Sequence, residues 1–394
     1  MSQFWLMKLL VVLSRFPYPL EKGDKLRAYH QLRFLSQHHE IYLVALNDRP
    51  IKQESIEKIA PFCKELHVVN LNWWTKFIHI LIFFFKGLPI QCGYFYSRKA
   101  QKLINRLIKE EKPDHIYGQL VRVAEYIKKA PVKKTIDYQD VLSKGMSRRA
   151  EVSPWYLNPF FKMEYQRLAR YETDIFPYFD HHTIITGVDR DLIPHPDFKR
   201  IYVVANGVDF NTYSYKGEEK IYDLIFTGNM SYLPNVDAAE YLAKVIFPQL
   251  LQGMPDLKLV ICGANPVPRV KHLAGPNITV TGWVDSMADY YAKSRIFIAP
   301  MHLGTGLQNK ILEAMAVELP CITSTLAGKP LENVESGKEI MVCSTITGYI
   351  ESIRLLLANP SLYREIGENG NLFVKRNYNW ETTTRKLEEI LELP

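Results

Sequence analysis

Residues 296–316 read IFIAPMHLGTGLQNKILEAMA. A short apolar strand over Ile296–Ala299 leads into a loop that contains Gly304 and Gly306, and a helical pattern follows over Asn309–Val317. Glycine lets backbone N–H groups approach a ligand closely, and a helix N-terminus favours an anion such as phosphate. The stretch therefore predicts a strand–loop–helix unit of an α/β sheet with an anion-binding loop.

Two charged side chains lie at the start of this predicted helix. Lys310 can supply a point charge to a diphosphate. Glu313 shares its helix face and can accept hydrogen bonds from ribose hydroxyls. A glycine turn followed by a helix with a stabilising Lys–Glu pair explains the spacing equally well. The loop is neither a Walker A motif nor a full Gly-x-Gly-x-x-Gly, so spacing alone does not decide.

Outward from this stretch, short apolar runs alternate with helical patterns along the whole chain. Strands are expected at residues 11–13, 42–46, 115–117, 135–136, 183–185, 224–227, 257–262, 278–281 and 321–323. Helices are expected at residues 26–35, 160–176, 238–247, 352–357 and 382–391. Residues 210–220 are polar and aperiodic, as in a linker. The pattern predicts two doubly wound α/β units in series.

Composition agrees with two domains in 394 residues. The first 200 residues contain 32 Lys and Arg against 21 Asp and Glu, whereas the net charge of the whole chain is +7. A basic first half suits nucleic acid, anionic lipid or a phosphorylated substrate. The five cysteines show no CxxC or metal-ligand spacing, which favours a reduced, cytoplasmic setting.

Two apolar segments of the sequence could interact with a membrane. Residues 8–13 resemble a short signal sequence but lack a cleavage site, so a buried first strand is expected. The apolar run Phe77–Phe85, bounded by Lys76 and Lys86, is too short to span a bilayer, and no transmembrane segment is expected. It lies within the longer stretch Trp73–Lys86. The adjacent tryptophans, the phenylalanine run and the lysines of this longer stretch suit a membrane-interface helix. A buried helix or the wall of an acceptor cleft fits equally well.

Several motifs together resemble glycosyltransferase family 4, the group 1 enzymes of the GT-B fold, and more narrowly the sugar transferases of bacterial exopolysaccharide clusters. The motifs occur in the family's order along nearly the whole chain: RFPYP (15–19), KGDK (22–25), Arg27, Asp137 and Asp140, NGVD (206–209), TGNM (227–230), PNVD (234–237), TGWV (281–284), GLQNK (306–310) and EAMA (313–316).

The resemblance implies two Rossmann-like domains facing each other across a cleft. Residues 1–205 would bind the acceptor, residues 206–217 would form a hinge, and residues 218–378 would bind a nucleotide-diphosphate sugar. The helix of residues 379–394 would pack back on the first domain.

The resemblance also implies site residues. Glu313 would hold the ribose, Lys310 would face the diphosphate and assist catalysis, and Gly23 would meet the donor from the first domain. The other donor-binding residues would be Gly228, Asn229, Gly282, Val284, His302, Thr305, Gly306, Leu307 and Gln308. Thr305 stands where the family has the first glutamate of its pair, and basic residues usual near Asn235 are missing.

The carboxylates outside the donor loop have either a functional or a purely structural interpretation. Asp137 and Asp140 follow a predicted strand at the sheet edge where active sites gather, so they are candidates for acceptor binding or catalysis. Turn or cap chemistry is the alternative. Asp189 and Asp191 form an Asp-x-Asp, a pattern that binds metal in other glycosyltransferases, but a solvated helix start is expected. His30, His38 and His39 are expected at the surface.

The expected reaction is transfer from a nucleotide-diphosphate sugar to a hydroxyl of a glycan or lipid-linked oligosaccharide, in cell-surface polysaccharide biosynthesis. Retention of anomeric configuration, no metal and no further cofactor are implied. No nucleic-acid partner is expected. The protein would be cytoplasmic or peripheral on the inner membrane face, held to anionic lipid by its basic first domain. The alternatives are a non-catalytic GT-B binding protein and a GT-B nucleotide-sugar epimerase.

Overall fold

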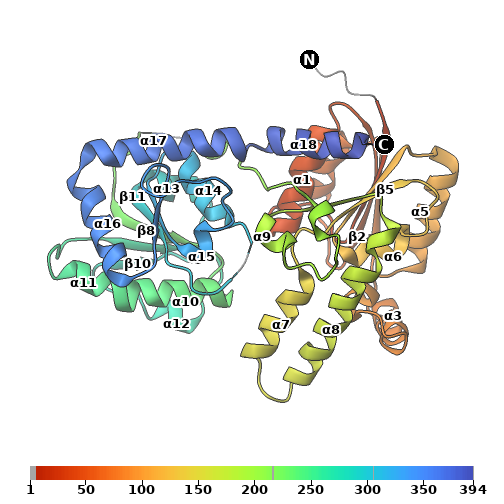
Figure 1. The fold of residues 1–394 in the computed structure, drawn as a ribbon, viewed down its shortest axis with the longest axis horizontal. Helices are drawn as coiled ribbons and strands as arrows, with labels where there is room; N and C mark the ends of the chain where they lie inside the picture. The colour runs from red at the N-terminus through yellow and green to blue at the C-terminus, as the bar shows by residue number, and fades with distance from the viewer. Residues whose placement is uncertain (1–5, 215–216, 305, 394) are drawn as a thin grey trace. The chain divides into compact units, whose positions relative to one another are not determined.

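The structure, a computed structural model, describes residues 6–214, 217–304 and 306–393. The chain divides into two compact units (Figure 1). The N-terminal unit comprises residues 1–205 and 384–394, and the C-terminal unit comprises residues 206–383. Each unit is built on one parallel sheet with crossover helices, which is what alternating strands and helices require.

Within the described residues, the sheet of the N-terminal unit has seven strands in the order β3-β2-β1-β4-β5-β6-β7. These strands are β1 (Lys8–Leu13), β2 (Glu40–Asn47), β3 (Glu65–Asn70), β4 (His115–Gln119), β5 (Lys133–Asp137), β6 (His181–Ile184) and β7 (Tyr202–Val203). The described sheet of the C-terminal unit has six strands in the order β10-β9-β8-β11-β12-β13. These strands are β8 (Tyr222–Thr227), β9 (Leu259–Cys262), β10 (Ile278–Val280), β11 (Ser294–Ala299), β12 (Cys321–Ser324) and β13 (Met341–Cys343).

The helices of the N-terminal unit are α1 (Gly23–Leu35), α2 (Gln53–Ile59), α3 (Trp73–Phe85), α4 (Ile90–Tyr94), α5 (Arg98–Glu111), α6 (Ala124–Ile127), α7 (Leu142–Val152), α8 (Asn158–Asp174) and α9 (Gly187–Arg190). Those of the C-terminal unit are α10 (Leu233–Tyr241), α11 (Phe247–Leu251), α12 (Pro268–Lys271), α13 (Met287–Ala292), α14 (Asn309–Ala316), α15 (Thr325–Gly328), α16 (Ile346–Ala358) and α17 (Pro360–Asn377). Helix α18 (Trp380–Glu392) crosses the unit boundary. None of the described helices combines the length and the apolar character needed to cross a bilayer.

Strand order places the ligand-binding edge of each sheet. The order reverses between β1 and β4 in one unit and between β8 and β11 in the other. In open parallel sheets, ligands bind outside the carboxyl ends of the strands at such a switch point. The prediction of two doubly wound parallel sheets is confirmed.

Alternation along β1 divides the core of the N-terminal unit between the two faces of its sheet. Leu9, Val11 and Leu13 join a buried cluster with α1, whereas Leu10 and Val12 join a second cluster with α5. This is the period-two pattern of a strand covered on both faces. Leu387 and Ile390 of α18 belong to the first cluster, so the end of the chain completes the core of the N-terminal unit.

The surface placement expected for His30 and His39 is wrong, because both side chains are buried. His39 lies with its Nε2 2.9 Å from Glu388 Oε1 of α18, and His38 Nδ1 lies 2.8 Å from the same oxygen. The C-terminal helix covers the end of α1, which a local reading of the sequence does not reveal.

Some elements differ from the expected ones. The strands β3 and β13 and the helix α17 are formed although none of them is among the expected elements. The helix expected at residues 238–247 begins earlier, at Leu233, and passes into a π-helical turn over Leu242–Ile246. The strand expected at 257–262 begins only at Leu259.

Candidate donor site and the comparisons

The predicted donor loop joins β11 to α14. Gly304 and Gly306 have φ angles of 113° and 73°, a region in which L side chains are strained. The Gln308 side chain donates to the Gly306 carbonyl at 3.3 Å, just before α14 begins. Leu307 is half-buried beside Gln308, and Thr305 lies outside the described residues. The loop therefore reaches the first turn of α14 by a backbone path that needs its glycines.

Lys310 is half-buried and its described neighbours are mostly neutral. Its Nζ donates to Asn235 Oδ1 at 2.5 Å and lies 4.8 Å from the centre of the Phe226 ring. None of the described ion pairs includes Lys310. Burial lowers the pKa of Lys310 to about 7, and the charge of Glu313 opposes this shift only in part. A second anionic group near Lys310 would favour its charged form.

Asn235, at the start of α10, is held by the loop after β8. Its side-chain amide donates to the Asn229 carbonyl at 2.9 Å. A Cβ at Gly228 would lie 2.6 Å from Asn235 Nδ2, so this approach requires glycine at 228. Gly228 and Asn229, both predicted donor-binding residues, thus fix the side chain that orients Lys310. Asn235 belongs to the PNVD motif of residues 234–237, but its contact with Lys310 does not follow from the motif.

Glu313 lies between two tyrosines. Its Oε2 accepts a hydrogen bond from Tyr291 OH at 3.2 Å, and Tyr213 also bonds to the carboxylate. Burial raises the pKa of Glu313, while these hydrogen bonds and Lys310 oppose the shift. Tyr291 OH is in turn 2.8 Å from Thr227 Oγ1. Neither tyrosine is among the predicted donor-site residues, and Tyr213 lies in the segment expected to be a linker.

The remaining predicted residues of the C-terminal unit lie at the same sheet edge. Gly282 follows β10 with φ 74°, and its carbonyl accepts from Gly263 N at 3.2 Å. Val284 is half-buried nearby in sequence. His302 follows β11, is exposed, and packs its ring 4.2 Å from that of Tyr241. The structure therefore brings together the carboxyl ends of β8, β9, β10 and β11.

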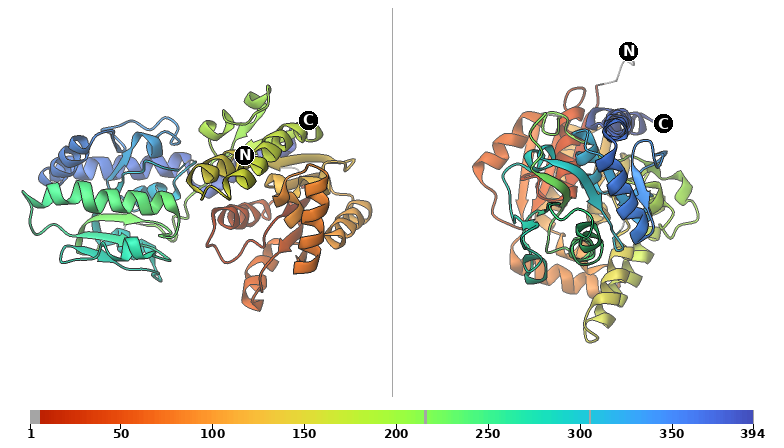
Figure 2. Two further views of the ribbon diagram at one scale, coloured as in Figure 1. Left: turned by 90° about the horizontal axis from the view of Figure 1, so that it is seen from below. Right: turned by 90° about the vertical axis from the view of Figure 1, so that its left-hand side faces the viewer.

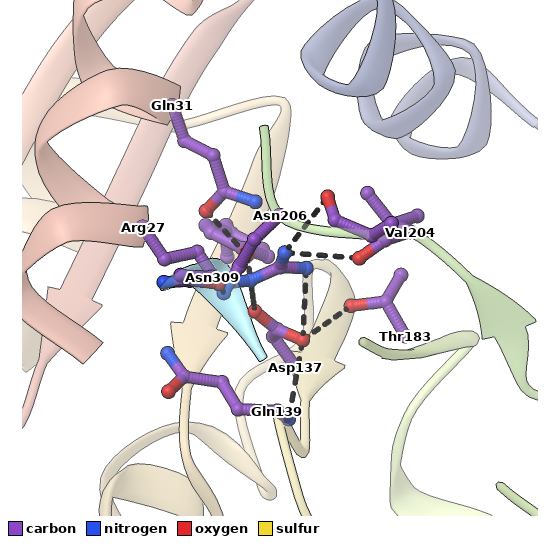
Figure 3. Close-up of polar contacts among 10 residues, drawn as sticks. Arg27, Gln31, Asp137, Gln139, Thr183, Val204, Asn206 and Asn309 are labelled. Atoms are coloured by element: carbon purple, nitrogen blue, oxygen red, sulfur yellow. Dashed lines mark hydrogen bonds and ion pairs between the residues drawn. The ribbon is translucent and has the colours of Figure 1, made fainter. Parts of the chain in front are cut away.

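Asp137, at the end of β5, is fully buried and bound to Arg27 (Figure 3). Arg27 Nε donates to Asp137 Oδ2 at 2.7 Å, and Tyr117 OH donates to the same oxygen at 2.9 Å. Thr183 Oγ1 donates to Asp137 Oδ1 at 3.0 Å, while Arg27 Nη1 donates to the Val204 carbonyl at 2.9 Å. These contacts give Asp137 a structural role, and its catalytic role stays a prediction.

Asp140 differs because its side chain is exposed. Desolvation by neighbouring atoms and the charge of Asp189 raise its pKa to about 6. The preceding Gln139 has φ 63°, and strain of this kind concentrates at functional sites. Gly23 begins α1, and a Cβ there would meet nothing within 4 Å, so internal packing does not require glycine at this position.

The Asp-x-Asp segment is only partly solvated. Asp189 is buried in the first turn of α9, where Thr186 Oγ1 donates to its Oδ2 at 2.6 Å, so the solvated placement expected for Asp189 is wrong. Asp191 is exposed and lies 3.1 Å from Arg190. Among the described residues there is no group of three His, Cys, Asp or Glu side chains that could hold a metal ion.

Part of the C-terminal unit matches a known family of proteins. Residues 222–359 match the family described as "Glycosyl transferases group 1". An uncharacterized 44.6 kDa protein in the cps region of Klebsiella pneumoniae is 22% identical, over 94% of this chain and 96% of its own length. The capsular polysaccharide biosynthesis glycosyltransferase CapM of Staphylococcus aureus is 24% identical, over 47% of this chain and 52% of its own.

A solved structure shows the same fold. Alr3699/HepE of Anabaena, determined in complex with UDP, is 13% identical and superposes with a TM-score of 0.68 over 98% of this chain and 99% of its own. The two parallel-sheet units and this superposition show the GT-B fold, and the family match together with the similarity to CapM supports a glycosyltransferase. The resemblance to the group 1 glycosyltransferases is confirmed, and the group 1 match covers the unit that contains Lys310 and Glu313.

Proposed function

We propose that this glycosyltransferase moves a sugar from a nucleotide-diphosphate sugar to a hydroxyl of a glycan or lipid-linked oligosaccharide during cell-surface polysaccharide synthesis. The observation that carries the proposal is the setting of Lys310. It is a half-buried amine at the N-terminus of α14, beside the sheet's switch point, with a neutral side chain as its hydrogen-bond partner. A diphosphate would supply the missing counter-charge.

Charge development gives Lys310 a part in the reaction. As the bond to the sugar breaks, negative charge grows on the leaving diphosphate, so an ammonium group that contacts it stabilises the transition state more than the ground state. Glu313, fixed by Tyr291 and Tyr213, presents a carboxylate suited to ribose hydroxyls. HepE was determined with UDP and with UDP-glucose, which supports a uridine nucleotide as the first donor to test.

On the acceptor side, we favour Asp140 over Asp137 as the carboxylate that meets a hydroxyl. Asp140 is exposed, and its pKa of about 6 lets it accept a proton near neutral pH. Asp137 is buried and already bonded to Arg27. Asp140→Asn should lower turnover at unchanged melting temperature, whereas unchanged kinetics would remove Asp140 from the acceptor site.

Retention of configuration and independence of metal complete the proposal. The support for the second is that Lys310 and the N-terminus of α14 already provide positive charge where the diphosphate would bind. Activity should survive treatment with EDTA. If chelation abolishes transfer and Mg²⁺ or Mn²⁺ restores it, the proposed charge stabilisation is wrong. The anomeric proton couplings of the product test retention directly.

The test of the function itself is a screen of nucleotide sugars with the full chain. A donor present at a hundred times its Kd should stabilise the folded protein by about 2.7 kcal/mol, which a thermal shift detects. Mass spectrometry of reactions with the stabilising donor then separates the possibilities. A glycosylated acceptor supports transfer, a released epimer indicates the epimerase alternative, and binding without turnover indicates a non-catalytic protein.

A further inference from the structure

Helix α3 exposes an unusual amount of apolar surface. The exposed large apolar side chains on this single helix are Trp73, Trp74, Phe77, Ile78, Leu81, Phe84 and Phe85. Trp73 and Trp74 are 61% and 59% exposed and stack on each other with centroids 3.5 Å apart, while Phe85 is 82% exposed. The helix is therefore not buried, which excludes one of the readings of its sequence.

The opposite face fixes α3 to the rest of the N-terminal unit. His79 and Phe83, one turn apart, are its buried side chains. A Cβ at Gly93 of α4 would lie 2.7 Å from the His79 carbonyl, so the two helices pack closely because residue 93 is glycine. Asn72 caps the helix by accepting from Thr75 N at 2.8 Å. The apolar face is thus displayed by a well-anchored helix.

A second exposed apolar group lies at the turn between α7 and α8. It consists of Trp155, Tyr156, Leu157 and Phe160, and Trp155 is 86% exposed. Figure 1 and the right-hand view of Figure 2 both show the α7–α8 hairpin projecting from the same side of the N-terminal unit as α3. The two groups together are called the aromatic surface below.

Direct contacts join α8 to α3 and α4, the helices around the first part of the aromatic surface. The Arg167 guanidinium of α8 lies 4.5 Å from the centre of the Phe84 ring, and it donates to the Leu88 carbonyl at 3.3 Å. Glu164 accepts hydrogen bonds from the backbone N–H groups of Ile90 and Gln91 at the start of α4. The hairpin and α3 are therefore held as one body within this unit.

The two segments that carry the aromatic surface are mostly basic in sequence. Residues 71–97 contain Lys76 and Lys86 and no acidic residue. Residues 142–170, which form the hairpin, contain six Lys and Arg against Glu151 and Glu164. Glu164 is buried in its bonds to α4, so Glu151 is the acidic side chain that this segment leaves exposed.

We propose that the aromatic surface docks this protein on an anionic lipid bilayer, with α3 and the tip of the α7–α8 hairpin entering the headgroup region together. Tryptophan, tyrosine and phenylalanine flanked by basic residues suit the membrane–water interface. Thirteen residues of helix rise about 20 Å, less than the roughly 30 Å hydrocarbon core, so α3 lies in the interface. The lysines and arginines beside the aromatic surface favour a membrane that contains anionic lipid.

The test is sedimentation of the full chain with vesicles of phosphatidylcholine alone or mixed with phosphatidylglycerol. The protein should sediment with the mixed vesicles and be released by high salt. Trp73→Ser with Trp74→Ser, and separately Trp155→Ser with Tyr156→Ser, should each weaken partition roughly tenfold or more. Lys86→Gln and Arg149→Gln should each weaken it about fivefold, because a basic residue near an anionic surface contributes about 1 kcal/mol.

The matched control is Leu355→Ser with Leu372→Ser, two side chains of the C-terminal unit that are 45% and 56% exposed. This variant should bind vesicles like the wild type. Equal binding by all variants, or no preference for phosphatidylglycerol, overturns the proposal. The proposal is also overturned if light scattering shows a dimer for the wild type and a monomer for the variant with Trp73→Ser and Trp74→Ser. The aromatic surface would then be a contact between two copies of the chain. Stabilisation by nucleotide sugars is measured on the same variants, so a failure of donor binding is recognised separately.

Discussion

Each unit places a cation and a carboxylate near the carboxyl edge of its sheet, but the two sets are held in opposite ways. Arg27 and Asp137 are fully buried, directly paired, and bonded further to Tyr117, Thr183 and a backbone carbonyl. Lys310 and Glu313 are half-buried and bond to neutral side chains, Asn235 on one side and two tyrosines on the other.

This difference indicates that Arg27 and Asp137 stabilise the fold, whereas Lys310 and Glu313 are available to bind a ligand. Removing one member of a buried ion pair destabilises the fold, because the charge that remains is buried without a counter-charge. Burial lowers the pKa of Lys310 to about 7, so its ammonium form is destabilised in the protein without donor. A bound anion would stabilise that ammonium form. Such perturbed groups at a sheet's switch point are candidates for function.

The largest expected effect is on Asp137. Asp137→Asn leaves the buried Arg27 guanidinium without its counter-charge, so the N-terminal unit should lose about 3–5 kcal/mol of unfolding free energy, measured by urea denaturation. Lys338→Gln, which removes an exposed lysine paired with Glu335 and Glu339, should leave the urea midpoint unchanged. A wild-type midpoint for the Asp137 variant would show that its buried pair is not structural.

Lys310 should behave in the opposite way. Lys310→Ala should lower turnover and donor affinity roughly 10–150-fold. This range corresponds to the loss of a hydrogen bond to a charged group, which contributes about 1.5–3 kcal/mol. Its melting temperature without donor should not fall. Folding lowers the pKa of Lys310 from 10.5 to about 7. Between these two pH values the unfolded chain therefore binds more protons than the folded chain, and the ammonium group of Lys310 opposes folding fully below about pH 7. A large loss of stability with normal kinetics would reverse the comparison.

Donor affinity should depend on pH through Lys310. A bound diphosphate favours the ammonium form, so binding takes up a proton above pH 7, and affinity should fall by up to about tenfold for each further pH unit until the pKa in the complex is passed. Calorimetry in two buffers of different ionisation enthalpy measures this proton. In Lys310→Ala the affinity should be lower and nearly flat from pH 7 to 9. A flat profile in the wild type would contradict the assignment.

The smallest expected effect is on Glu313. No charge develops at the ribose, so Glu313→Gln should mainly raise the donor KM, by roughly 2–12-fold for a hydrogen bond of about 0.5–1.5 kcal/mol, with turnover nearly unchanged. Tyr291→Phe, which removes the hydroxyl that donates to Glu313, should raise the same KM without a change in pH dependence. A fall in turnover without a change in KM would place Glu313 at the reacting centre.

The sequence by itself determined the alternation of strands and helices, the glycines before α14 and the positions of Lys310 and Glu313, because strand and helix periods and glycine's conformational freedom are local properties. Its errors arose where distant segments meet. His39 is buried because α18 covers it, and Tyr213 reaches Glu313 although its own neighbourhood resembles a linker.

Only the tertiary structure decided which polar groups share a partner. Asn235 and Lys310 are 75 residues apart, and Arg27 and Asp137 are 110 residues apart, yet each pair is in direct contact. Burial, which shifts the pKa of Lys310 and separates the role of Asp137 from that of Asp140, depends on the packing of many segments at once. The exposure of α3 is decided in the same way, because its sequence suits a protein core and a membrane interface equally well.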